Sequence, residues 1–195
     1  MRRVIYILVL LILAASTFGF KEAIYNKGLE VGIGYAFGGF GFEVGFERKI
    51  SQNIDLYPWI RFGGIGGYYT YTDVRYDRSF GIGFQVDLPI SIYSQSFFTI
   101  AISPLVGADI VFIPRETVFW LDFGAYGLFS FDLRKEKIPL SISFGVGPDL
   151  YFGRNFGFGV YWVLAFSFYI EDLVIQIGGN SKFAGLALKI TSISF

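Results

Sequence analysis

The chain has 195 residues, a length that suits one domain, and 53% of them are hydrophobic and 21% aromatic. Only 16% are charged, against about a quarter in soluble domains, and the formal net charge of zero gives no indication of a nucleic-acid partner. The absence of Cys and His excludes disulfides, thiolate metal sites and catalysis by a histidine base, so we expect neither an enzyme nor a bound metal or cofactor.

The N-terminal residues have the pattern of a secretory signal peptide. Arg2 and Arg3 give a positive start, residues 4–15 form an apolar run, and Thr17 and Gly19 supply small residues for a signal peptidase. The apolar run is shorter than the ~20 residues that a membrane-spanning helix needs. We therefore predict a signal peptide over residues 1–19 and one domain over residues 20–195.

Residues 28–50 read GLEVGIGYAFGGFGFEVGFERKI, in which large apolar residues alternate with small or acidic ones. This period of two predicts two β-strands joined by a turn at Gly38–Gly39. The same alternation recurs along the chain and gives ten candidate strands in all. The eight further strands are expected within residues 54–62, 80–88, 97–106, 118–133, 140–147, 156–171, 173–178 and 183–195.

The two faces of these strands distinguish between classes of β protein. A soluble sandwich would carry Lys, Glu, Arg and Thr on its exposed face, whereas the second face here is mostly Gly, Ala and Ser. Small residues suit the inside of a narrow closed barrel, whose apolar outer face then meets lipid. Residues 159–170 are apolar enough for a membrane helix but too short for one, and they are rich in strand-favouring aromatics. We predict an all-β, antiparallel up-and-down transmembrane β-barrel.

The end of the chain adds a further pattern: a terminal aromatic residue, Phe195, preceded two positions earlier by Ile193. With the signal peptide and strands of about 9–11 residues, the mature chain resembles the small bacterial outer-membrane β-barrels, the OmpA-, OmpX- and OmpW-like porin group in the broad sense. The resemblance implies an outer-membrane location, contact with outer-membrane lipid, and an assembly signal at Ile193 and Phe195 read by the barrel-assembly machinery. The apolar residues of 186–190 are in the opposite phase, which requires either a bulge near Thr191 or a Phe195 that faces away from lipid.

Both ends of such a barrel lie in the periplasm, which requires an even number of strands: ten, with eight as the alternative. The periplasmic turns are then the polar connections 47–53, 88–96, 133–139 and 170–173. The outer loops are the Gly- and Tyr-rich connections 63–79, 107–117, 150–155 and 178–182, the first being the longest.

The inner phase of the strands gives the candidate functional residues. Those expected in the interior or at its periplasmic mouth are Glu30, Glu43, Glu47, Asp55, Arg61, Gln85, Asp87, Asp122, Asp132, Glu171 and Lys189. Inner-phase aromatics such as Trp59 and Tyr126 favour a barrel filled by side chains, whereas the interior glycines favour open space.

Three functions are compatible with this interior. The first is a structural barrel, or one that interacts through its loops. The alternative is a narrow pore for small solutes, weakly cation-preferring because acids gather at the periplasmic mouth, or else a conduit for hydrophobic ligands.

Overall fold

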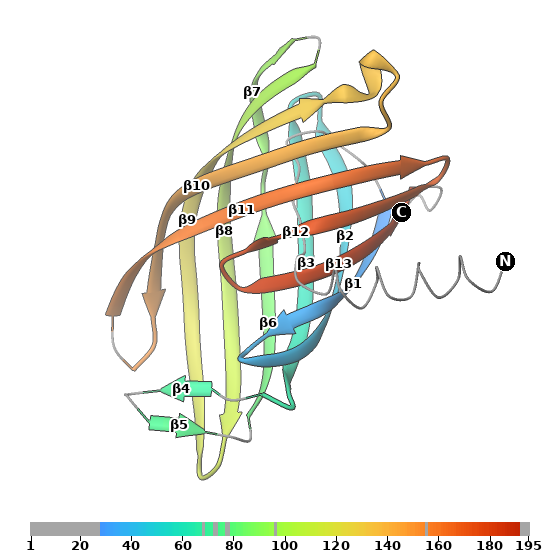
Figure 1. The fold of residues 1–195 in the computed structure, drawn as a ribbon. Coiled ribbons are helices and arrows are strands. Elements are labelled where there is room, and N and C mark those ends of the chain that lie inside the picture. Colours follow the sequence, from blue (N-terminus) through green and yellow to red (C-terminus); the bar gives the residue numbers. More distant parts are fainter. Residues whose placement is uncertain are drawn as a thin grey trace, which may run out of the picture.

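The computed structural model describes residues 28–67, 69–71, 74–76, 79–95, 97–154 and 156–191. The expected signal peptide (residues 1–19) and the expected assembly signal at Ile193 and Phe195 lie outside these described residues. The fold is all-β and forms a closed antiparallel barrel (Figure 1). Its strands are β1 (Gly28–Ala36), β2 (Gly39–Ser51), β3 (Ile54–Ile65), β6 (Phe80–Asp87), β7 (Ile90–Gln95), β8 (Phe98–Ile113), β9 (Glu116–Asp132), β10 (Leu140–Phe152), β11 (Phe156–Ile170), β12 (Leu173–Asn180) and β13 (Phe183–Ile190).

The barrel has ten strands, because β6 and β7 are two segments of a single barrel strand. Both pair with β3 on one side and β8 on the other, and they are separated by Leu88 and Pro89. Proline has no backbone N–H to donate to a strand ladder, and its carbonyl instead accepts a hydrogen bond from the Asp55 N–H at 3.0 Å. The ring closes where β1 pairs with β13, with Glu30 opposite Lys189. The predicted up-and-down barrel of ten strands is confirmed, and the eight-strand alternative is excluded.

Several predicted connections differ from the structure. Residues 88–96 were expected to be a turn, but Ile90–Gln95 continue the ladder as β7 and pair with β8. Residues 107–117 were expected to be a loop, but strand alternation runs on to Ile113 and resumes at Glu116, leaving a two-residue turn. The first hairpin turns at Phe37–Gly38, one residue earlier than expected, and both residues have positive φ, 51° and 83°.

The longest predicted outer connection contains a small hairpin, β4 (Tyr69–Tyr71) and β5 (Val74–Tyr76), outside the barrel sheet. The turn between β9 and β10 contains a 3-10 helix, η1 (Leu133–Glu136). No helix in the described part of the chain is long and apolar enough to cross a membrane.

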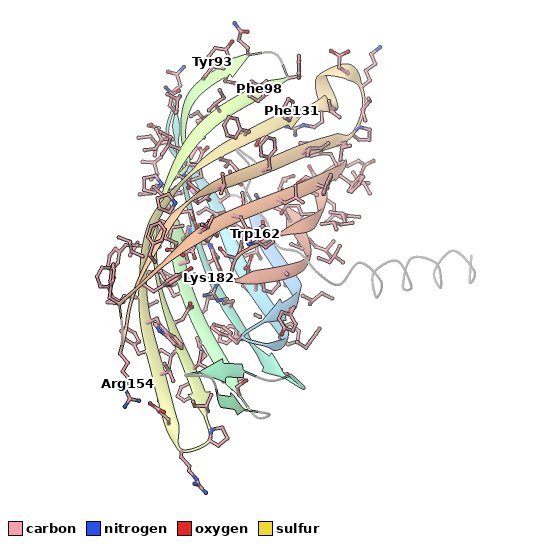
Figure 2. The ribbon with its side chains drawn as sticks, turned by 60° about the vertical axis from the view of Figure 1, so that its left-hand side comes forward. Tyr93, Phe98, Phe131, Arg154, Trp162 and Lys182 are labelled. Carbon is pink, nitrogen blue, oxygen red and sulfur yellow. The ribbon has the colours of Figure 1, made fainter. Side chains whose placement is uncertain are left out.

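The outward face of the barrel is apolar. Phe42, Phe84 and Phe144 are 42–50% exposed, and Phe98 and Phe131 lie together on this face with ring centroids 5.0 Å apart (Figure 2). In the described barrel strands, charged residues at outward positions are confined to strand ends, as at Arg48.

The rim of the barrel is stepped. We call the end where β1 begins and β13 finishes the terminal end, and the opposite end the far end. At the far end the β12–β13 hairpin stops well short of the β8–β9 hairpin (Figure 1). The last β11–β12 pair is Val163 with Asn180. In the described part of the chain, Phe156–Tyr161 of β11 therefore pair only with β10, and we call this unpaired edge beyond the end of β12 the notch.

Candidate functional site: the barrel interior and its far-end cavity

The middle of the barrel is filled by large side chains. Trp59, Tyr126, Tyr161 and Leu128 are each at most 2% exposed, and the two tyrosine rings lie 4.9 Å apart between centroids. Together with Ala101, Leu105 and Val163, the two tyrosines and Leu128 form one apolar cluster. The aromatics therefore fill the lumen, as their inner phase indicated.

The interior glycines provide room for neighbouring side chains and leave little open space. A Cβ added to Gly83 would lie 2.3 Å from an Asp109 carboxylate oxygen and 2.5 Å from Arg61 Nε. A Cβ on Gly81 would fall within 2.2 Å of the Phe37 ring. The space that these glycines leave is thus already occupied.

Asp87 is the centre of a buried hydrogen-bond network. Its carboxylate accepts hydrogen bonds from Trp59 Nε1 at 3.0 Å, from Gln85 Nε2 at 3.0 Å and from the Tyr126 hydroxyl at 3.3 Å. Gln85 Nε2 also donates to the Tyr161 hydroxyl at 3.2 Å. These contacts connect β3, β6, β9 and β11 across the lumen, so a single carboxylate holds the aromatic filling in place.

A second polar cluster lies toward the terminal end around Lys189. Its Nζ forms a close ion pair with Glu47, lies 3.9 Å from a Glu30 oxygen and sits 5.6 Å from the centroid of the Tyr57 ring. Glu30 is fully buried, and Lys189 is 2% exposed. Buried charges are tolerated when they are paired in this way.

A third cluster lies toward the far end. Arg61 forms a close ion pair with Asp109, and its guanidinium lies 4.9 Å from the Phe37 ring and 5.0 Å from the Trp59 ring. Lys182, in the β12–β13 turn, reaches into the ring of strands (Figure 2), where its Nζ pairs closely with Asp122 and lies 3.4 Å from Asp109. These contacts join the turn to β8 and β9.

A cavity of about 390 Å³ adjoins this cluster, and Phe156 and Gly157 at the notch are among the residues that line it. Its edge includes Phe156 and Ser181, both exposed, and its walls include Trp120 and Tyr151. The cavity is lined by Asp109, Trp120, Asp122, Tyr151, Phe156, Gly157, Ser181 and Lys182. We call it the far-end cavity. A small molecule can reach this part of the interior from the surface.

Most of the predicted inner residues are buried inside the barrel. Those at most 6% exposed are Glu30, Glu43, Glu47, Asp55, Arg61, Gln85, Asp87, Asp122 and Lys189. The other two lie at the rim of the terminal end. Asp132 is half-buried at the rim, where it caps η1 and pairs with Arg134 at 2.7 Å. Glu171 is exposed in the tight β11–β12 turn with φ 51°, because the strand ends before it.

Sequence reasoning missed Asp109, Asp149 and Lys182 as interior residues. Asp109 was assigned to a loop, although it continues the inner phase of Gly107 and Val111. The turn that contains Lys182 had no alternation to indicate that its side chain folds inward. In the described residues no group of three or more acidic side chains is arranged to hold a metal ion. Comparisons with protein-family models, curated proteins and solved structures found no match.

Proposed function

We propose that this protein is an integral outer-membrane β-barrel whose interior is closed by side chains and whose role is structural or interactive, exercised at its far end. The observation that carries the proposal is the reversal of polarity: the outward face is apolar, and the charges are buried within. A water-soluble barrel has the opposite arrangement.

The size of the apolar surface favours lipid over water as its surroundings. Among the described residues, 32 large hydrophobic side chains are exposed. Moving such a side chain out of water is worth roughly 1 kcal/mol when it is about half exposed, since full burial is worth about 1.5–3 kcal/mol. The total is on the order of 30 kcal/mol, larger than the typical stability of a folded domain, about 5–15 kcal/mol.

Location is tested by fractionating cells that express the full chain. The protein is expected in the outer-membrane fraction, and in detergent it should give a β-type circular dichroism spectrum. Recovery in the soluble periplasmic fraction would contradict the proposal.

The closed interior is tested by conductance in planar bilayers. The wild-type protein should show no steady channel, because Trp59, Tyr126 and Tyr161 fill the lumen. The triple variant Trp59→Ala, Tyr126→Ala, Tyr161→Ala should conduct, and it serves as the positive control. Steady wild-type conductance equal to that of the triple variant would contradict a closed barrel.

A narrow, cation-preferring pore is the second candidate, and the excess of buried acids favours it. The buried carboxylates are Glu30, Glu43, Glu47, Asp55, Asp87, Asp109, Asp122 and Asp149. The buried bases of the described interior are fewer: Arg61, Lys182 and Lys189. An acidic lumen attracts cations. Under a salt gradient, the reversal potential of any channel should indicate cation preference, and the double change Asp55→Asn, Asp87→Asn should reduce it. Anion preference would contradict this candidate.

A further inference from the structure

The Lys182 side chain is a cation held in a carboxylate site by its own turn. Its side chain is 8% exposed, and it reaches Asp122 and Asp109, whose side chains are 1% and 12% exposed. The turn is fixed by Asn180, whose Oδ1 accepts hydrogen bonds from the backbone N–H groups of Lys182 at 2.8 Å and Phe183 at 2.9 Å. The backbone is therefore anchored, while the flexible lysine chain supplies the ammonium.

Carboxylates outnumber cations at this place. Asp149 is fully buried, and its carboxylate is close enough to Lys182, Asp122 and Asp109 to interact with them electrostatically. Among the described residues, neither Asp149 oxygen has a donor within hydrogen-bonding geometry, although the Tyr151 side chain lies close to the carboxylate. With Arg61 and Lys182 as the cations, three carboxylates face two positive charges.

The two cations differ in mobility. Arg61 is 1% exposed and is held between the rings of Phe37 and Trp59 while it pairs with Asp109. Lys182 extends from a turn beside the far-end cavity, on a chain of four methylenes. Lys182 is thus the cation that can leave the carboxylates without rearrangement of a strand.

The cavity beside the Lys182 ammonium has aromatic walls. Trp120, Tyr151 and Phe156 line it, and its volume of about 390 Å³ is within the range of small-molecule sites. Aromatic faces attract both alkyl groups and cations. An entering ligand would place apolar atoms against these rings and its charge toward Asp122.

We propose that the far-end cavity binds a protonated primary amine carried on an apolar group, whose ammonium replaces the Lys182 Nζ between Asp122 and Asp109. The lysine ammonium has the same charge and the same three donors as the ligand group, so it acts as a built-in competitor. This inference goes beyond the proposed function, and it applies whether or not the barrel conducts.

The test measures binding of n-hexylammonium to the full-length protein folded in detergent, by isothermal titration calorimetry. Wild type should bind weakly, and Lys182→Met should bind at least about 10-fold more tightly, because the competing ammonium is gone. Adding Asp122→Asn to Lys182→Met should abolish the gain. Lys137→Met, which changes an exposed lysine after η1, is the matched control and should behave as wild type.

Further probes separate charge from apolar contact. Hexanol and hexanoate should not bind, and methylammonium should bind more weakly than n-hexylammonium. Trp120→Ala, which keeps the ion pairs, should weaken n-hexylammonium binding even if the Lys182 variant does not fold. Equal affinity of wild type and Lys182→Met, tighter binding of hexanoate, or displacement of n-hexylammonium by MgCl₂ alone would each overturn the proposal.

Discussion

Single glycines determine how closely charged side chains can approach one another in this barrel. Gly83 lies directly against the Arg61–Asp109 pair, whereas Gly127 faces outward, where the nearest heavy atom to an added Cβ would be 3.8 Å away. Both glycines lie within barrel strands, but Gly83 faces the crowded interior and Gly127 faces the open outer surface.

We expect Gly83→Ala to destabilise the barrel by about 1–3 kcal/mol, the usual cost of overpacking a filled interior. Gly127→Ala should be neutral or slightly stabilising, because alanine loses less backbone entropy on folding. Urea unfolding of both variants in detergent measures the difference. Equal changes in the free energy of unfolding for the two variants would show that the interior at Gly83 can accommodate a methyl group.

At the scale of the element, the hairpin turns combine backbone strain with packing. Arg115 in the β8–β9 turn has φ 75°, and Phe37 in the β1–β2 turn has φ 51°. Non-glycine residues are uncommon in this region of backbone space. Only Phe37 places its side chain inward, against Gly81 and Arg61.

The two turns therefore separate strain from packing. Arg115→Gly should leave stability unchanged or raise it by up to about 1 kcal/mol, since glycine relieves the positive φ. Phe37→Gly relieves the same strain but removes a packed ring, so it should destabilise the barrel by about 2–4 kcal/mol. Thermal unfolding followed by circular dichroism compares the two. A stabilised Phe37→Gly variant would indicate that the ring contributes little.

Alternation along the strands predicted much of the fold but only part of the interior. The period of two correctly predicted which residues of the strands point inward and which point outward, because one face meets the barrel interior and the other meets the surroundings of the barrel. Which inner residues meet is decided by the register around the whole ring. The contact of Lys182 with Asp122, from a turn to a distant strand, cannot be read from either segment alone. Pro89 directly follows the predicted strand 80–88, yet it interrupts the ladder only locally, because Ile90–Gln95 resume the pairing as β7.

At the scale of the whole molecule, the proposed insertion into the outer membrane can be tested at Phe195, one of the two residues of the expected assembly signal. Deleting Phe195 should lower the yield of folded protein in the outer membrane and leave export intact, if Phe195 belongs to an assembly signal as the resemblance implies. Cell fractionation with an export control measures both. Deletion of Lys137, in an exposed turn, provides a one-residue control. An unchanged folded yield without Phe195 would contradict this role.

The unequal strand lengths have a consequence for the surrounding bilayer. β8 and β9 have 16 and 17 residues, and β12 and β13 have 8 each. At roughly 3.3 Å per residue the long strands run about 53–56 Å and the short ones about 26 Å. In the proposed membrane setting, hydrophobic mismatch is therefore built into one molecule, and the barrel must tilt or thin the lipid beside β12 and β13. The short side is also the side of the notch, so any thinning there would draw lipid headgroups toward the far-end cavity.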